Sequence, residues 1–238
     1  MTNLIQKPSF REKEGLIHLD DSGLTFNAQR VGPMNFAGLR NADYGYGFRM
    51  PTIPELIPLV YAALESQKHQ TAKSIVNTLK DYWLTGNTGI LYTPKGMFVQ
   101  DNPSINDRRV VMEEKTLESK LGSHEEKGVV FSNDRKIRFV PYGFKTKSQT
   151  ASELAENQGV IAFAGSQENA EKLAKSSTHY KQNPYFWALS NRKIPETRVA
   201  GLDSGVFVGR LGVDAGDGGL NGGRCSFGVI SDAEGIAF

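Results

Sequence analysis

The sequence predicts an α+β fold, and three observations support this. Apolar residues recur at helical spacing after residue 52, while short alternating apolar runs lie before that segment and again later in the chain. The third observation is size. A chain of 238 residues that is 39% hydrophobic and 23% charged can bury a core of this mixed type without disulfide bonds.

The N-terminal segment is predicted to form a β-hairpin. Leu16–Leu19 and Leu24–Phe26 are short apolar runs, and Asp20–Gly23 between them has the residue types of a tight turn. Residues 32–48 that follow are rich in glycine, asparagine and aromatic residues. We expect this stretch to be a loop that is packed by its own aromatic side chains.

Two helices are predicted next. Thr52 and Glu55 have the spacing of a capping box, and Pro54 lies early enough in the helix to be tolerated. A second helix is expected from Gln70 to Trp83, because apolar residues recur on one face there. The glycines that follow predict that the next strand is short and covers residues 90–92.

The middle of the chain is expected to mix strands and short helices. Residues 129–131 and 137–140 have the pattern of paired strands, and residues 152–157 and 167–176 that of helices. Residues 160–163 between those helices are all apolar, which predicts a short buried strand.

Composition excludes several classes of protein. The 28 basic and 26 acidic residues give a net charge of +2, too balanced for a dedicated nucleic-acid-binding protein. The single cysteine, Cys225, excludes a disulfide scaffold and a cysteine zinc site, and no two of the four histidines have metal-ligand spacing. No metal and no cofactor is therefore expected. The sequence shows neither a signal peptide nor a transmembrane segment, and it does not predict a localisation.

The C-terminal part has an unusual composition. Its last 38 residues contain 11 of the 25 glycines and no lysine. Lys, Glu, Gln, Met and Trp make up 47 of the 238 residues, so a stretch of 30 should contain about six of them on average composition. Residues 201–230 contain none. A glycine-rich turn region would exclude long side chains in any case, so this absence supports more than one explanation.

Two segments resemble a known family. Gly47–Leu56, with the sequence GFRMPTIPEL, resembles the entry to the first helix of C-type-lectin-like domains of the formylglycine-generating-enzyme type. Arg198–Ile230 resembles the end of that fold, where display loops precede a final strand. The resemblance implies a C-type-lectin-like fold with two helices, a small antiparallel sheet and a loop-rich display face. Residues 1–238 would form one such domain, with residues 84–197 as an insertion or elaboration that has its own small core.

The order of these segments is most similar to the variable proteins of diversity-generating retroelements. In that family, AAC and AAT codons are mutated at adenine, and such codons never yield Lys, Glu, Gln, Met or Trp. The resemblance therefore implies a binding protein, not an enzyme, that displays residues 198–230 to an unknown protein or surface ligand. The oligomeric state is left open.

Framework and display positions can be separated within residues 198–230. Apolar spacing assigns to the framework Arg198, Val199, Leu202, Phe207, Leu211, Val213, Phe227, Val229 and Ile230, and turn chemistry adds Gly209, Arg210, Gly222, Gly223 and Arg224. The candidate ligand-binding positions are Asp203, Gly205, Val206, Val208, Asp214, Gly216, Asp217, Gly218, Gly219, Leu220, Asn221 and Cys225.

Two alternatives remain open. The first is an enzyme of the formylglycine-generating-enzyme superfamily type, with an oxidase-like or hydrolytic activity that involves Cys225 and His124 or His179. The oxidation of a sulfatase cysteine, which is that enzyme's own activity, needs a pair of cysteines and is not implied for this chain. A viral tail-tip structural protein overlaps with the display function, because variable proteins often lie at such tips.

Overall fold

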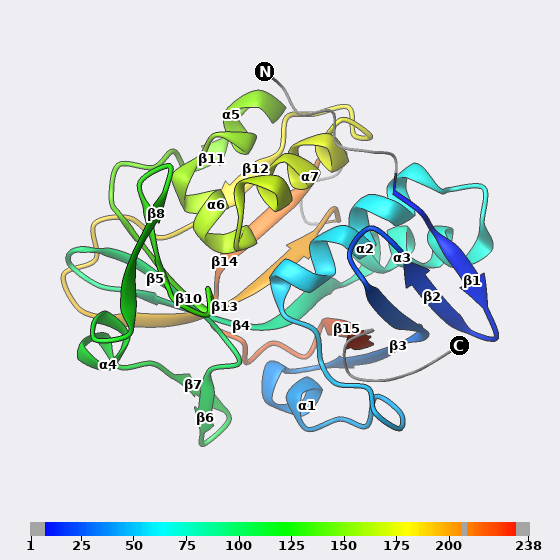
Figure 1. The fold of residues 1–238 in the computed structure, drawn as a ribbon, viewed down its shortest axis with the longest axis horizontal. Coiled ribbons are helices and arrows are strands. Elements are labelled where there is room, and N and C mark those ends of the chain that lie inside the picture. Colours follow the sequence, from blue (N-terminus) through cyan, green and yellow to red (C-terminus); the bar gives the residue numbers. More distant parts are fainter. Residues whose placement is uncertain (1–7, 206–208, 232–238) are drawn as a thin grey trace.

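A computed structural model describes residues 8–205 and 209–231, and its fold is organised around one large sheet (Figure 1). Among the described residues this sheet has thirteen strands, and a separate hairpin has two. The strands are β1 Arg11–Lys13, β2 Leu16–Leu19, β3 Leu24–Met34, β4 Trp83–Tyr92, β5 Gly96–Asp101, β6 Ser104–Asn106, β7 Arg109–Val111, β8 Leu121–Glu126, β9 Val129–Ser132, β10 Ile137–Pro141, β11 Lys147–Ser148, β12 Tyr185–Trp187, β13 Glu196–Asp203, β14 Gly212–Asp217 and β15 Arg224–Ser231.

Seven helices lie within the described ranges. They are α1 Phe36–Arg40, α2 Ile53–Glu65, α3 Gln70–Asp81, α4 Glu114–Glu118, α5 Ala151–Ala155, α6 Gln158–Ala164 and α7 Gln167–Ser177. The α+β content agrees with the prediction, but the expected two helices and small antiparallel sheet are wrong. Two of the additional helices, α5 and α7, follow the pattern of the middle segment, whereas α1, α4 and α6 are short and were not predicted as helices.

The last strand of the described chain lies inside the sheet, between β3 and β4. The last strand, β15, pairs antiparallel with β3 and, at Arg224 and Cys225, parallel with β4. Strand β4 also pairs with β5 and β13, so it joins the N-terminal, middle and C-terminal parts of the sheet. The loop between β14 and β15 consequently starts and ends on strands that are fixed within the sheet.

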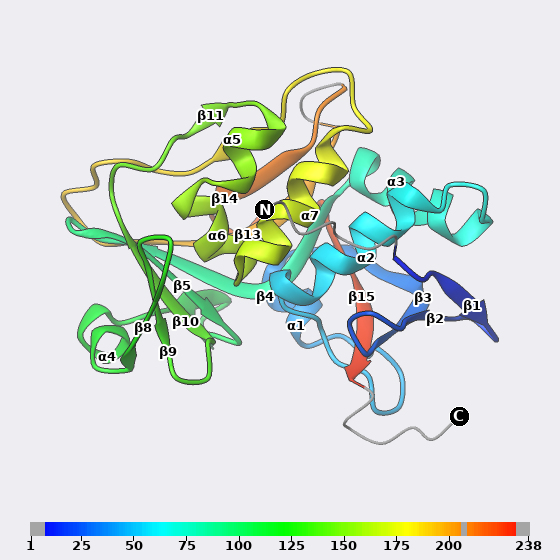
Figure 2. The same ribbon diagram turned by 45° about the horizontal axis from the view of Figure 1, so that its top comes forward.

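The two faces of the sheet are covered differently. Helices α2, α3, α5, α6 and α7 gather on one face, where the main hydrophobic core lies (Figures 1 and 2). The opposite face carries α1 and the β6–β7 hairpin, and a smaller core lies beneath them. Its buried members are Phe36, Leu39, Tyr44, Met50, Val110 and Val199.

Residues 84–197 contribute to both the common core and a smaller one. Phe131, Val140 and Phe163 belong to the main cluster that also contains residues of α2 and β15. A separate small cluster, Leu91, Phe98, Leu117 and Ile137, lies within the segment. Strands β4, β5 and β10 from this segment are integral parts of the large sheet.

The predicted capping box of α2 is confirmed. Thr52 is the N-cap, and the Glu55 carboxylate accepts the Thr52 N–H at 2.7 Å. A buried network fixes the same helix end to the sheet. Thr88 Oγ1 accepts the N–H of Ile53 at 3.0 Å and donates to Asp101 at 2.8 Å. Arg138, which is fully buried, binds Asp101 through both terminal nitrogens, so its charge is compensated.

Several sequence predictions are confirmed. Strands β2 and β3 form the expected hairpin, with Leu19 opposite Leu24. Strands β9 and β10 are antiparallel neighbours, as the middle segment predicted. Helices α5 and α7 lie at the predicted positions, with ends that differ by at most two residues.

Other predictions are wrong. Residues 160–163 form part of helix α6, because Asn157 caps its first turn and Gly165, at φ +83°, ends it. The helix is buried on all sides, so it has no polar face, and its sequence lacks the helical alternation of polar and apolar residues. The expected loop at 32–48 begins as the end of β3 and continues as α1. Its aromatic residues do not all pack, since Tyr46 is fully exposed.

The boundary between α3 and β4 also differs from the prediction. Trp83 belongs to β4 and not to the preceding helix, because Tyr82 already has extended backbone angles. Strand β4 then runs through Gly86 and Gly89 without a turn. A Cβ on Gly86 would lie 2.5 Å from the backbone nitrogen of Ile53, so glycine is required there for the close approach of α2.

Candidate functional site

The candidate site is the β14–β15 loop (residues 218–223) and the strand ends beside it. The loop lies on the face of the sheet opposite to the main helical layer, because it packs on α1 and on Val199. The N–H of Phe36 donates to the carbonyl of Gly219 at 3.0 Å, and Trp83 donates in the same way to Gly223 at 3.1 Å. The loop is therefore held at two points by the framework.

An ion pair closes the loop at its base. Arg224 at the start of β15 is fully buried, and its guanidinium contacts the carboxylate of Asp217 at the end of β14. Arg224 also donates to Thr85 Oγ1 at 3.0 Å. The Asp217 carboxylate in turn accepts the N–H of Gly219 at 2.6 Å. Arg224 belongs to the framework predicted from the sequence, and it is completely buried.

The candidate binding positions differ widely in exposure. Among the described ones, the exposed positions are Gly218, Leu220 and Asn221, the half-buried ones are Gly205, Asp214, Gly216 and Asp217, and the buried ones are Asp203, Gly219 and Cys225. A buried side chain cannot touch a ligand at the surface, so the last three cannot serve as direct contacts in this conformation. Val206 and Val208 lie outside the described residues.

The glycines divide into two groups. A Cβ added to Gly218 or Gly222 would have no atom within 4 Å, and one added to Gly216 would meet its nearest atom at an ordinary 3.7 Å. By contrast, a Cβ on Gly219 would lie 3.0 Å from Val199 Cγ1, and φ there is +77°. A Cβ on Gly205 would overlap the carbonyl oxygen of Lys80. The first group can accept side chains and the second cannot.

Gly222 was missed as a candidate position. Turn chemistry placed it in the framework, but it is exposed and open to a larger side chain. No sequence signal separates it from Gly223, whose Cβ would lie 3.3 Å from the Trp83 ring. The remaining described apolar framework residues, including Leu202, Val213 and Phe227, are buried as predicted.

Acidic side chains lie close together beneath the loop. The pKa of the Asp214 carboxyl is raised to about 6, mainly because the group is buried. The carboxylates of Asp217 and Asp203 contribute to this rise, whereas the Gly216 N–H and Arg224 oppose it. The Gly216 N–H donates to Asp214 Oδ1 at 2.8 Å. The Asp214 side chain is therefore held by the backbone of its own strand. Its protonation depends on the charges of Asp217, Asp203 and Arg224 at the base of the loop.

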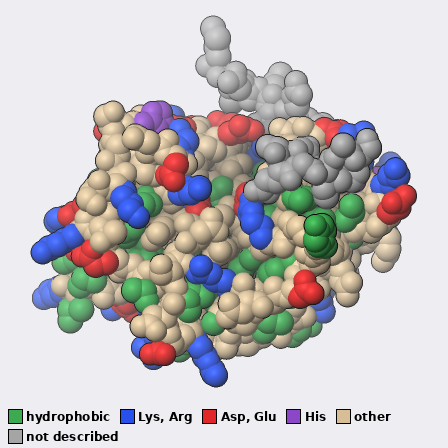
Figure 3. All heavy atoms as spheres, turned by 60° about the horizontal axis from the view of Figure 1, so that its bottom comes forward, with side chains coloured by type: hydrophobic (Ala, Val, Ile, Leu, Met, Phe, Trp, Pro, Cys, Tyr) green, Lys and Arg blue, Asp and Glu red, His purple; other side chains and the backbone are tan. Residues whose placement is uncertain are grey.

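A groove borders the exposed half of the loop. Its cavity has a volume of about 460 Å³, and its walls come from three segments: β7, the start of β13 and the β14–β15 loop. The lining residues are Arg109, Val110, Pro195, Glu196, Thr197, Arg198, Val199, Gly218 and Leu220. Figure 3 views the side of the molecule that carries α1 and the β6–β7 hairpin, where hydrophobic and charged side chains are intermixed.

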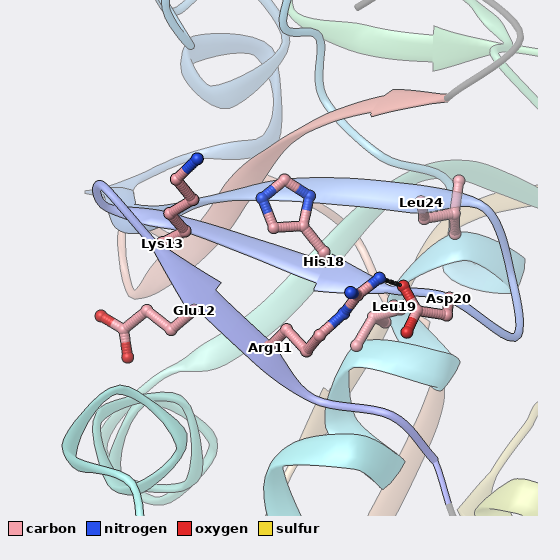
Figure 4. A pocket seen from close by; sticks show the side chains of 7 residues that line it. All are labelled: Arg11, Glu12, Lys13, His18, Leu19, Asp20 and Leu24. Atoms are coloured by element: carbon pink, nitrogen blue, oxygen red, sulfur yellow. Dashed lines mark hydrogen bonds and ion pairs between the residues drawn. The ribbon is translucent and has the colours of Figure 1, made fainter. Parts of the chain in front are cut away.

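A second hollow, of about 470 Å³, lies on the N-terminal hairpin (Figure 4). Its lining comes from β1, β2 and β3, and the Arg11 guanidinium pairs with Asp20 across it. The hydrogen bond from Ser9 and the pairing with Arg11 lower the pKa of the Asp20 carboxyl. None of the candidate positions from the sequence lies there, and the ion pair is exposed.

The thiol of Cys225 is not placed for nucleophilic chemistry. It is fully buried on β15, and burial raises its pKa. Both histidines of the enzyme alternative bind other residues: His124 contacts Arg135 at 2.8 Å, and His179 contacts Glu65 at 2.9 Å. Within the described ranges, no three His, Cys, Asp or Glu side chains are grouped as a metal site would require. The helices in those ranges are too short or too polar to cross a membrane.

The comparisons with known proteins concern the fold. The sequence matches no protein-family model and no curated protein. A solved structure that resembles it comes from work on the accommodation of massive sequence variation in Nanoarchaeota by the C-type lectin fold. The two structures superpose with a TM-score of 0.55 and 16% sequence identity, over 85% of this chain and 97% of that one. The chain therefore has a C-type lectin fold, with a larger sheet than the sequence had suggested.

Proposed function

We propose that this chain is a ligand-binding display protein whose β14–β15 loop is diversified by retroelement-driven mutagenesis of adenines. One observation carries the proposal: exposed, sterically open positions are grouped on a loop whose base is held by a buried ion pair. Substitutions at such positions cost little stability, because they do not alter packing.

The structure narrows the set of diversified positions that we propose. Gly216, Gly218, Leu220 and Asn221 remain from the sequence-based set, and Gly222 joins them because it is open and exposed. All five can be encoded after adenine mutation of an AAC or AAT codon. We assign the buried or sterically closed positions to the framework instead; these are Asp203, Gly205, Gly219 and Cys225.

Asp214 and Asp217 are neither as exposed as the proposed diversified positions nor as buried as the framework positions. Both are half-buried, and Asp217 holds Arg224. A change at Asp217 would remove the partner of a buried guanidinium, so we treat it as part of the loop anchor. The nanoarchaeal structure supports the proposal in one respect: the C-type lectin fold accommodates massive sequence variation in that protein.

The DNA beside the gene tests the proposal. We expect a near-identical copy of codons 198–230, next to a reverse-transcriptase gene, with AAC or AAT at the codons for 216, 218 and 220–222. Sibling genes should differ mainly at these codons. Absence of the repeat, or siblings that differ mostly within residues 84–197 and share the same loop, would refute diversification. A template with adenine-rich codons at 219 and 225 would refute the narrowed set.

A further inference from the structure

The groove beside the β14–β15 loop combines a diversifiable wall with a constant one. Gly218 and Leu220 form the first wall, while Arg109 on β7 and Arg198 on β13 belong to segments outside the proposed diversified positions. A ligand in this groove would meet the same constant residues whatever the loop sequence is. The chemistry of the constant wall therefore indicates what the ligands of all variants share.

The constant wall has an uncompensated positive charge. Three charged side chains line the groove: Arg109, Arg198 and Glu196. Glu196 forms ion pairs with both Arg198 and Arg192, so its negative charge is already shared between two guanidinium groups. Arg109 is exposed, and its side chain forms no ion pair or hydrogen bond with the described residues. Its five N–H donors can therefore bind a carboxylate.

Apolar side chains surround this charge. Val110 and Val199 are buried at the base of the groove, and Leu220 on the loop is 56% exposed. Of the large hydrophobic side chains that are exposed in the described parts of the chain, Leu220 is the one that lines this groove. An exposed leucine above two buried valines gives the groove an apolar part next to its charge.

We propose that this groove binds a segment of a partner protein that presents a carboxylate next to an aliphatic side chain, with Arg109 as the constant contact for the carboxylate. The inference rests on the proposed display function, and it specifies the class of ligand. Charge complementarity favours an acidic segment, because the wall carries one guanidinium that no described residue of the chain neutralises. The exposed Leu220 would cover the aliphatic part.

Short peptides can test this on the full chain. The probe is acetyl-Leu-Asp-Leu-Asp-amide, titrated against ¹⁵N-labelled protein while the amide signals of Gly218 and Leu220 and the side-chain Nε–H of Arg109 are observed. The isosteric acetyl-Leu-Asn-Leu-Asn-amide is the neutral control. We expect the acidic peptide to shift these signals and to bind about two- to fivefold more tightly than the neutral one, the size of effect expected for a charge pair at an exposed site.

Two neighbouring arginines provide matched variants. Arg108 precedes Arg109 at the tip of the β6–β7 hairpin and is also exposed, but it does not line the groove. We expect Arg109→Gln to abolish the preference for the acidic peptide and Arg108→Gln to preserve it. Equal binding of the two peptides, the same loss in both variants, or no shift with either peptide would overturn the proposal. None of these outcomes affects the search for a repeat beside the gene, so the proposed display function is tested independently of the proposed ligand class.

Discussion

Asp217 and Arg224 form an ion pair that joins the end of β14 to the start of β15. The guanidinium is completely buried, whereas the carboxylate retains a fifth of its exposure. The loop between these residues can vary in sequence while its two ends stay at a fixed separation. The same arginine reaches Thr85 on β4, so the anchor extends to the central strand of the sheet.

Loss of this anchor should destabilise the protein. Arg224→Ala leaves Asp217 without its partner and opens a space beside Trp83, whose ring lies 5.8 Å from the guanidinium. We expect the free energy of unfolding to fall by about 3 kcal/mol, the lower end for breaking a buried pair, because Asp217 is partly solvated. Urea denaturation measures it. Arg109→Ala, which removes an exposed arginine, should change stability by less than about 0.5 kcal/mol. Similar losses in the two variants would show that Arg224 is not an anchor.

The glycines of the loop give a second prediction. Serine at Gly218 or Gly222 meets open space and should change the free energy of unfolding by less than about 0.5 kcal/mol. Serine at Gly219 must adopt φ +77° and displace Val199, so we expect a loss of at least about 2 kcal/mol. Thermal or urea unfolding of the three single variants decides this. If Gly219→Ser is as stable as Gly218→Ser, the proposed framework role of Gly219 is wrong.

Gly218 and Gly219 show what the sequence could and could not predict. Local signals succeeded: the Thr52–Glu55 capping box and the turn between β2 and β3 depend on residues a few positions apart. Whether a glycine is open or closed depends on what the fold places beside it. For Gly219 this is Val199, which only the pairing of β13 with β14 brings near. No local pattern could have distinguished Gly218 from Gly219.

The sequence indicated the region of the candidate site but not all of the residues that line it. The absence of Lys, Glu, Gln, Met and Trp over 201–230 drew attention to the region that contains the loop. Arg109 was missed, because it lies on a hairpin far earlier in the chain and reaches the groove only through the packing of β7 against β13. Helix α6 was missed for a different reason, since complete burial leaves no polar face to reveal its period.

Asp214 predicts a specific dependence of stability on pH. Its pKa in the folded state, about 6, is higher than the ordinary value of 3.8, so the folded state binds its proton more tightly than the unfolded state does. The ionisation of Asp214 therefore lowers the free energy of unfolding as the pH rises from about 4 to 6. Above pH 6 this loss of stability stays constant. Asn cannot ionise and can still accept the Gly216 N–H. Asp214→Asn should therefore gain stability relative to the wild type between pH 4 and pH 8.

The size of this gain follows from the shift. A carboxyl pKa raised from 3.8 to about 6 corresponds to about 3 kcal/mol, which is an upper bound for a half-buried side chain. Urea denaturation of both proteins at the two pH values measures the difference, and the carboxyl groups that do not interact with Asp214 cancel because both proteins contain them. A difference that is the same at pH 4 and pH 8 would show that Asp214 titrates normally.

The single cysteine allows a direct test of the enzyme alternative. Cys225 is fully buried on β15, and burial raises the pKa of its thiol. Alkylation requires the thiolate and access to it, so native protein should react with iodoacetamide at least about a hundredfold more slowly than the same protein in urea. Mass spectrometry follows the reaction without ambiguity, because no other thiol is present. Native protein that reacts as fast as free cysteine would mean that β15 opens readily at Cys225, and it would make thiol chemistry a serious candidate again.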